Sequence, residues 1–184
     1  MIVNETNGQS FDIRQLVSWG ILLLLFAIAF SRFESGMPLG DPAPMIQTQL
    51  LDGQSFDSTQ MRGKVIILDF WATWCGPCQA SLPALSRVVQ KYEKEDWVWI
   101  GSVNTDEDLS DQQVAGFLRA RQLKIPVILD PNSAISYQFH VRSLPTMVII
   151  DAEGRVKHTE SGIISRNPDV LYNELVNLVE SFRP

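Results

Sequence analysis

Cysteine is scarce in this chain of 184 residues: there are two, and both lie in the segment Trp74-Cys75-Gly76-Pro77-Cys78. This scarcity excludes a disulfide framework that joins distant segments. A bridge between these two cysteines closes almost no loop, so it removes little entropy from the unfolded chain. Two thiols so close together can instead pass between the dithiol and the disulfide. The pair therefore favours a redox centre over a structural staple.

The chain also lacks a run of Lys or Arg, and its formal net charge is -6. An acidic balance of this kind argues against nucleic acid as a partner. Histidine is nearly absent, since only His140 and His158 occur. Zinc prefers four ligands, and neither histidine has a suitable spacing to the cysteines. We therefore expect no metal and no bound cofactor, and we interpret both histidines, with Glu160, as ordinary surface or loop residues.

Charge is missing altogether between Arg14 and Arg32, and residues 16–30 are almost wholly apolar. A helix over that apolar stretch would span roughly 25 Å, slightly short of a bilayer core, and the flanking arginines could snorkel to its surfaces. We predict a leader at 1–14 and a transmembrane anchor at 15–31. The alternative is a signal peptide cleaved near Ala27-Ile28-Ala29, although the leader lacks the positive charge of a signal peptide.

Residues 32–44 are rich in Gly and Pro and are predicted to be a linker. The remaining stretch, 45–184, is long enough for one domain with its own core. Strands alternating with helices, followed by a hairpin and a terminal helix, predict a three-layer α/β/α domain. The expected strands are 46–51, 55–56, 65–70, 98–103, 126–129, 146–150 and 156–160, and the expected helices are 80–92, 110–122, 133–139 and 168–182.

The two cysteines lie where a buried strand gives way to a helix, and Pro77 suits the first helical turn. The N-terminus of a helix carries unpaired N–H groups and a partial positive charge, which stabilise a thiolate. The first thiol of such a pair is the more exposed one. We therefore predict that Cys75 is the nucleophile and that Cys78 resolves the mixed disulfide.

The segment Leu68–Cys78, which reads LDFWATWCGPC, resembles the active-site segment of the thioredoxin superfamily. Ser143-Leu144-Pro145-Thr146 resembles the second signature of that superfamily, the cis-proline loop. The linker Asp41-Pro42-Ala43-Pro44, the N-terminal hairpin and the inserted segment 110–129 are similar to the membrane-anchored TlpA/ResA group of thiol-disulfide oxidoreductases. The resemblance covers residues 40–184 and implies a thioredoxin-like fold with a central mixed sheet.

The resemblance also implies roles for individual residues. Pro145 would be cis and would pack against the disulfide, and the backbone of Leu144 would pair with an extended substrate segment. Trp74 would offer an apolar contact surface beside the thiolate. Gly76 and Pro77 form the thioredoxin dipeptide, whose couple lies near about -270 mV, against about -120 mV for strong oxidants. This dipeptide indicates a reductase.

Asp69 interrupts an otherwise apolar strand, six positions before Cys75. A carboxyl group in a buried strand is unfavourable unless it has a function or local hydrogen bonds that satisfy it. In thioredoxins the matching acid moves a proton to and from the resolving thiol, and desolvation raises its pKa. Many ResA-like proteins carry a Glu three residues after the second cysteine, where this chain has Ser81. We expect Asp69 to take over the acid–base task.

These predictions describe a protein-disulfide reductase at the cell membrane, with its catalytic domain on the extracytoplasmic (periplasmic) side. Its partners would be disulfide-containing proteins, as in cytochrome c maturation, and a thiol oxidoreductase that donates electrons. Two alternatives stay open. One is a copper-binding metallochaperone module, because thiolates suit Cu(I). The other is a disulfide oxidase or isomerase.

Overall fold

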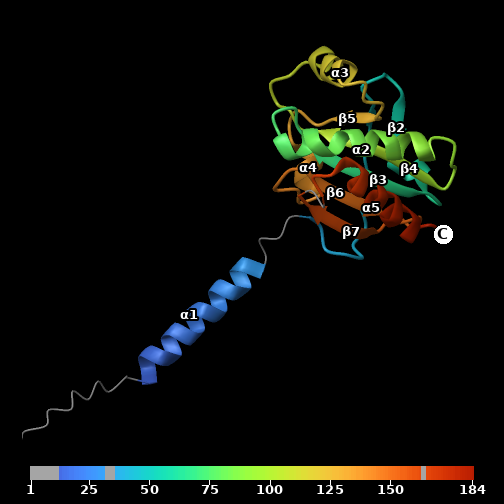
Figure 1. Ribbon diagram of the computed structural model, residues 1–184. Helices are drawn as coiled ribbons and strands as arrows, with labels where there is room; N and C mark the ends of the chain where they lie inside the picture. The colour runs from blue at the N-terminus through green and yellow to red at the C-terminus, as the bar shows by residue number, and fades with distance from the viewer. Residues whose placement is uncertain (1–12, 32–35, 163–164) are drawn as a thin grey trace, which may run out of the picture. The chain divides into compact units, whose positions relative to one another are not determined.

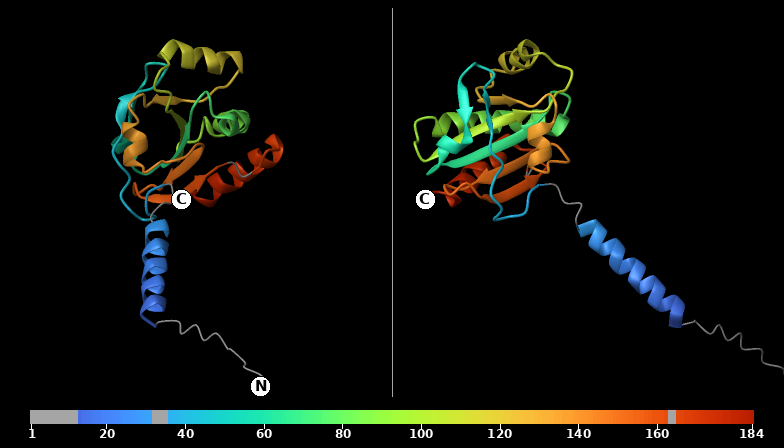
Figure 2. Two further views of the ribbon diagram at one scale, coloured as in Figure 1. Left: turned by 90° about the vertical axis from the view of Figure 1, so that its left-hand side faces the viewer. Right: turned by 180° about the vertical axis from the view of Figure 1, so that it is seen from behind.

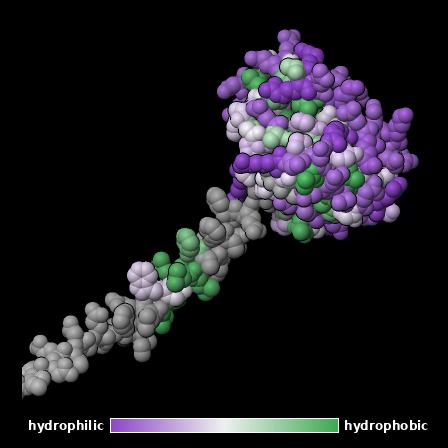
Figure 3. Space-filling model, in the orientation of Figure 1, coloured by the Kyte–Doolittle hydropathy of each residue, from purple (hydrophilic) through white to green (hydrophobic). Residues whose placement is uncertain are grey.

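The computed structural model describes residues 13–31, 36–162 and 165–184. The chain divides into two units, Met1–Glu34 and Ser35–Pro184. In the first unit, α1 (Ile13–Ser31) is a helix whose large apolar side chains between Val17 and Phe26 are exposed, as Figure 3 shows by its hydropathy colours. Within the described part of the chain, no helix combines the length and the apolar character that a membrane span requires. Most of the predicted leader and residues 32–35 of the predicted linker lie outside the described residues.

The second unit is built around a five-stranded mixed sheet with the order β5-β4-β3-β6-β7 (Figure 1). The pairs β3–β4 and β4–β5 are parallel, whereas β3–β6 and β6–β7 are antiparallel. This arrangement confirms the predicted mixed sheet. The strands are β3 (Val65–Trp71), β4 (Val98–Asn104), β5 (Val127–Leu129), β6 (Thr146–Ile150) and β7 (Val156–Ser161).

One face of the sheet is covered by three helices, α2 (Gly76–Tyr92), α3 (Asp111–Ala120) and α5 (Pro168–Ser181). The crossovers β3-α2-β4 and β4-α3-β5 step through the sheet in one direction, and right-handed crossovers of that kind place both helices on the same face. Figure 2 shows α2 and α5 together on this side. Alternate residues of β3, including Val65 and Ile67, point into this layer and contribute to its core.

The opposite face is covered by the N-terminal hairpin and by α4 (Ala134–Gln138), seen on the other side of the sheet in the left view of Figure 2. The hairpin pairs β1 (Gln47–Gln49) with β2 (Ser55–Asp57), as predicted. Phe56 of β2 is buried and stacks against Trp99 of β4 at 4.5 Å between ring centroids. All seven residues of β3 are buried because both of its faces are covered.

The helices agree with the predicted ranges, with one difference that matters for the site. Helix α2 begins at Gly76 and not at residue 80, because Cys75 is its N-cap and Pro77 lies in its first turn. Apolar periodicity becomes visible only from Leu82 onward, which made the predicted start too late, whereas the expectation that Pro77 lies in the first helical turn is confirmed. A short 3₁₀ helix, η1 (Ser58–Met61), was also missed, since four residues show no periodicity.

Candidate active site

The two cysteines form a disulfide at the start of α2, and their Cα atoms lie 5.2 Å apart. The backbone N–H of Cys78 donates to Cys75 Sγ at 3.2 Å, so the sulfur itself caps the helix. Cys75 is 5 % exposed, whereas Cys78 is fully buried. A substrate sulfur can approach only an exposed atom. The geometry therefore favours Cys75 as the point of attack and Cys78 as the internal partner.

The disulfide is bordered by exposed residues of its own motif and by the loop before β6. Trp74 is 72 % exposed, and Gly76 and Pro77 are exposed as well. The Leu144–Pro145 peptide bond is cis, the geometry that the resemblance implied. Leu144 is half-buried and packs against the core that contains both cysteines.

A groove of about 350 Å³ is lined by Trp74, which precedes Cys75 in the chain, and by Leu144. The exposed side chain of Tyr137 on α4 also lines it. The groove thus joins the cysteine motif to the cis-proline loop. An extended polypeptide that approaches Cys75 would meet this surface.

The loop that carries the cysteines is fixed by a buried acid that the sequence analysis did not single out. Asp106 accepts hydrogen bonds from Thr73 N at 2.8 Å and from Thr73 Oγ1 at 3.0 Å. It also accepts one from Asn104 Nδ2 at 2.7 Å. These bonds connect the end of β4 to the segment just before Cys75. Asp106 therefore positions the loop that carries the cysteines through Thr73.

Asp69 is 5 % exposed, and its Oδ2 atom has no hydrogen-bond partner among the described residues. Desolvation by burial raises the pKa of this carboxyl to about 7. The alternative in which local hydrogen bonds satisfy the acid is therefore wrong for this oxygen. A carboxyl that titrates near neutral pH can both accept and return a proton under physiological conditions.

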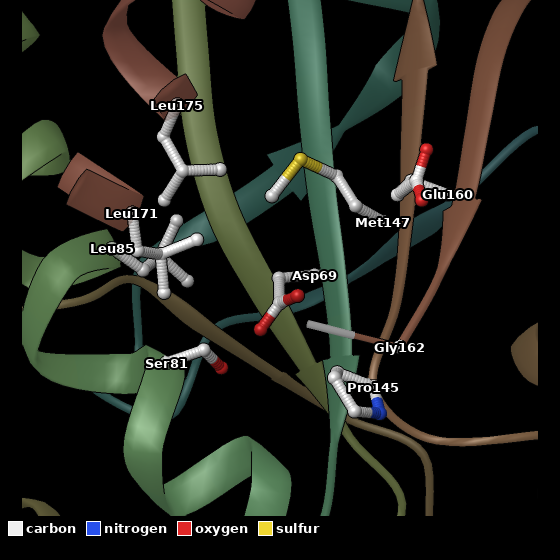
Figure 4. A pocket seen from close by; sticks show the side chains of 9 residues that line it. All are labelled: Asp69, Ser81, Leu85, Pro145, Met147, Glu160, Gly162, Leu171 and Leu175. Carbon is white, nitrogen blue, oxygen red and sulfur yellow. The ribbon is translucent and has the colours of Figure 1, made fainter. Parts of the chain in front are cut away.

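A cavity of about 30 Å³ adjoins Asp69, and Figure 4 shows the side chains around it. Ser81 lines the cavity from α2, one helical turn after Cys78, and its hydroxyl donates to the Cys78 carbonyl at 3.0 Å. Pro145 lines it from the loop before β6. The structure thus gathers Asp69, Ser81 and Pro145 around one small space. Trp74 and Leu144 line the separate groove described above.

Neither histidine lines the groove or the Asp69 cavity. His158 lies on β7, with its Nε2 atom 3.6 Å from Glu160 Oε2. His140 follows α4 in a left-handed backbone conformation. In the ranges that the structure describes, no group of three or more His, Cys, Asp or Glu residues is placed to hold a metal ion. Glu160, however, lines the Asp69 cavity, a position that its sequence gave no reason to expect.

A buried central strand, a Cys-x-x-Cys disulfide at a helix N-terminus and a cis-proline before the next strand define a thioredoxin-fold thiol-disulfide oxidoreductase. The Redoxin family model matches residues 38–175, and the chain belongs to this family. Within the thioredoxin superfamily it is a TlpA/ResA-like member.

Two relatives and one solved structure illustrate the similarity. "Thiol-disulfide oxidoreductase ResA" of Bacillus thuringiensis subsp. konkukian is 33% identical over 142 residues, which cover 74% of this chain and 80% of the relative. "Thioredoxin-like protein YneN" of Bacillus subtilis is 30% identical over 138 residues, covering 74% and 79%. A thioredoxin-family thiol:disulfide interchange protein from Chlorobium tepidum superposes with a TM-score of 0.61 at 23% identity, covering 75% of this chain and 97% of the other. The last comparison concerns the fold alone.

Proposed function

We propose that this oxidoreductase works as a reductase of disulfides in extracytoplasmic proteins and is held at the cell membrane by residues 15–31. The observation that carries the proposal is the Cys75–Cys78 pair at the start of α2, where Cys75 is 5 % exposed and Cys78 is fully buried. The unpaired, buried carboxyl of Asp69 supplies the acid–base group. The Gly76-Pro77 dipeptide supports the reducing direction.

In the proposed reaction, the Cys75 thiolate attacks one sulfur of a substrate disulfide. The substrate S–S bond breaks, a mixed disulfide with Cys75 forms, and the first substrate thiolate takes up a proton. The Asp69 carboxylate then accepts the proton of the Cys78 thiol, and the Cys78 thiolate attacks Cys75 Sγ. The second substrate thiolate leaves and takes up a proton, so two electrons have passed to the substrate. A thiol oxidoreductase that donates electrons returns Cys75 and Cys78 to the dithiol.

The surface around Cys75 fits an extended polypeptide as substrate. Trp74, Gly76 and Pro77 provide an exposed apolar surface beside the sulfur. The Leu144 backbone, just before cis-Pro145, offers N–H and C=O groups for strand addition. We assign the substrate contacts to these residues. Apocytochrome c is one client class that meets these requirements.

Tethering at the membrane rests on the uncharged segment between Arg14 and Arg32. The apolar side chains of α1 from Val17 to Phe26 are exposed and need an apolar environment. The flanking arginines suit the two lipid–water interfaces. The proposed orientation, with residues 45–184 on the extracytoplasmic side, gives the enzyme access to proteins that carry disulfides.

Replacing Cys78 with serine in the full-length chain is expected to stall mixed disulfides on Cys75, because the resolving thiol is gone. The trapped proteins would be separated on non-reducing gels and identified by mass spectrometry. They are expected to be extracytoplasmic and to stay with membranes washed in alkaline carbonate. The matched control is Cys75→Ser combined with Cys78→Ser, which should trap nothing. A Cys78→Ser chain that traps no protein would contradict disulfide exchange, and its release by carbonate would contradict the anchor.

The direction of exchange can be tested by equilibrating the full-length protein with glutathione redox buffers. We expect a midpoint potential near about -270 mV, as for thioredoxin. The Cys75→Ser variant, which cannot form the disulfide, serves as the blank for the signal. A midpoint near about -120 mV would instead indicate an oxidase and would rule out the reductase.

A further inference from the structure

The segment 36–44, which follows the proposed anchor in the sequence, is hydrogen-bonded to the start of β7. Gly40 N donates to Val156 O at 2.7 Å, and Val156 N donates to Asp41 O at 2.9 Å. The side chain of Arg155 adds a bond from Nη1 to Gly40 O at 2.8 Å. We call residues 36–44 the strap. Because the two backbones exchange bonds in both directions, the strap has a fixed place on the domain.

The strap begins at a glycine that no other residue could replace without a shift of its surroundings. Gly36 has a φ of 105°, which L side chains rarely adopt. A Cβ atom at this position would overlap with the side chain of Thr159 on β7. In this close-packed position the N–H of Gly36 donates to the carbonyl of His140 at 2.9 Å. The strap therefore reaches from β7 to the residue that follows α4.

His140 occupies a conformation that is unfavourable for a residue with a Cβ atom, since its φ is 54°. The conformation ends α4: His140 N donates to Tyr137 O at 3.1 Å, and Val141 N donates to Ser136 O at 2.9 Å. Glycine is the usual residue at such a helix end. The bond from Gly36 holds the His140 carbonyl in place. The strap thus supports a left-handed turn that this chain forms without glycine.

The turn at His140 joins two parts of the groove that carries the proposed substrate contacts. Tyr137 lines the groove from α4, before the turn. Residues 141–144, after the turn, all line it as well and lead into cis-Pro145. The backbone direction at His140 therefore decides how this loop lies relative to α4. A change at His140 would alter the shape of the groove without touching either cysteine.

We propose that the strap is a positioning element of the substrate groove: the bond from Gly36 to His140 holds the left-handed turn that places loop 141–144. The catalytic part of this inference rests on the proposed function, because it takes the groove as the binding surface for substrate polypeptides. Gly36 and His140 are positioning residues that act through the loop. The segment after the anchor thereby supports substrate binding, while the reactivity of Cys75 toward a small disulfide does not depend on it.

The inference is tested by single-turnover reduction in the full-length protein, with insulin as the polypeptide disulfide and hydroxyethyl disulfide as the small one. Gly36→Ala is expected to raise the half-saturating concentration of insulin by about fivefold, within the range of losses that misplaced groups cause. The limiting rate and the rate with hydroxyethyl disulfide should not change. The matched control is Gly53→Ala, a positive-φ glycine in the hairpin turn with open space around it.

A second substitution separates positioning of the loop from a general loss of stability. Glycine adopts the left-handed conformation without strain, so His140→Gly should keep the turn in place without the strap. The double variant Gly36→Ala, His140→Gly is therefore expected to recover the half-saturating concentration of the wild type. If the wild type reduced neither compound, the proposed function would fail. If it reduced both and Gly36→Ala matched Gly53→Ala, the inference alone would fail.

Amide hydrogen exchange in the oxidised protein tests the strap independently of activity. The Gly36 amide should be protected in the wild type, because it donates to His140. Gly36→Ala is expected to speed exchange of the Val141 amide, which closes the turn, by about tenfold. His140→Gly should restore its protection in the double variant, and Gly53→Ala should leave it unchanged. An unprotected Gly36 amide in the wild type would overturn the inference, as would Val141 exchange that Gly36→Ala does not alter.

Discussion

At pH 8, replacing Asp69 with asparagine is expected to raise the free energy of unfolding of the oxidised protein by up to about 4 kcal/mol. Burial raises the pKa of this carboxyl from 3.8 to about 7, so the folded protein holds an unfavourable buried charge at pH 8. A tenfold change in the protonation equilibrium corresponds to about 1.36 kcal/mol, so a rise of the pKa from 3.8 to about 7 corresponds to about 4 kcal/mol. Asparagine keeps the shape of the side chain and removes the charge.

The rise in the free energy of unfolding caused by Asp69→Asn should itself become larger as pH rises. Between pH 3.8 and about 7, folded Asp69 binds a proton that the unfolded chain has lost, so stability falls as pH rises through this window. Above pH 7 the destabilisation by ionised Asp69 levels off. Near pH 4 the wild type and Asp69→Asn should be almost equally stable. Urea unfolding at pH 4, 6 and 8 measures the difference, and Asp96→Asn, at an exposed site, is the control. A gain of the same size at every pH would contradict the buried charge as its cause.

The same substitution should weaken catalysis. Without a carboxylate to accept the Cys78 proton, release of substrate from the mixed disulfide is expected to slow by about 100-fold at pH 7. Asp69→Asn would then raise the free energy of unfolding and lower the rate of substrate release. This combination indicates a residue kept for its chemistry at the expense of the fold.

Much of this domain was predictable because its signals are local. The run Val65–Phe70 is apolar without alternation, and the structure buries it on both faces as the central strand β3. Asp69 stands out in that run because a carboxyl contradicts the pattern around it. The cysteine spacing and the Leu144-Pro145 pair are likewise short segments. Each could be interpreted without knowing what lies next to it in space.

The site residues that the sequence did not predict depend on contacts between segments that are distant in the chain. Asp106 lies in the sequence Asp106-Glu107-Asp108, which has the composition of a solvated acidic loop. The structure separates these residues, since Asp106 is buried while Glu107 and Asp108 are exposed. What distinguishes Asp106 is its pairing with Thr73, 33 positions earlier. Glu160 has the same character: only the packing of β7 beside β6 brings it to the Asp69 cavity.

Asp106→Ala is expected to lower the free energy of unfolding by about 3 kcal/mol and to reduce the rate of attack at Cys75. The change removes the acceptor of three hydrogen bonds, from Thr73 N, Thr73 Oγ1 and Asn104 Nδ2. Each buried donor left without a partner is unfavourable by about 1–3 kcal/mol, although water entering the vacated space would recover part of this. The loop before Cys75 would then lose the bonds that hold it against β4.

Chemical unfolding and the single-turnover rate of mixed-disulfide formation measure the two effects. Asp106→Asn keeps one acceptor oxygen and should fall between the wild type and Asp106→Ala in both. Asp108→Ala removes a neighbouring exposed carboxyl and should leave both within error of the wild type. If Asp106→Ala matched Asp108→Ala, the hydrogen bonds to Thr73 would not be what positions the catalytic loop. A loss of stability without a loss of rate would instead show that Asp106 has a structural role only. If the loop were displaced, Cys75 would move relative to the incoming disulfide and the rate of attack would fall.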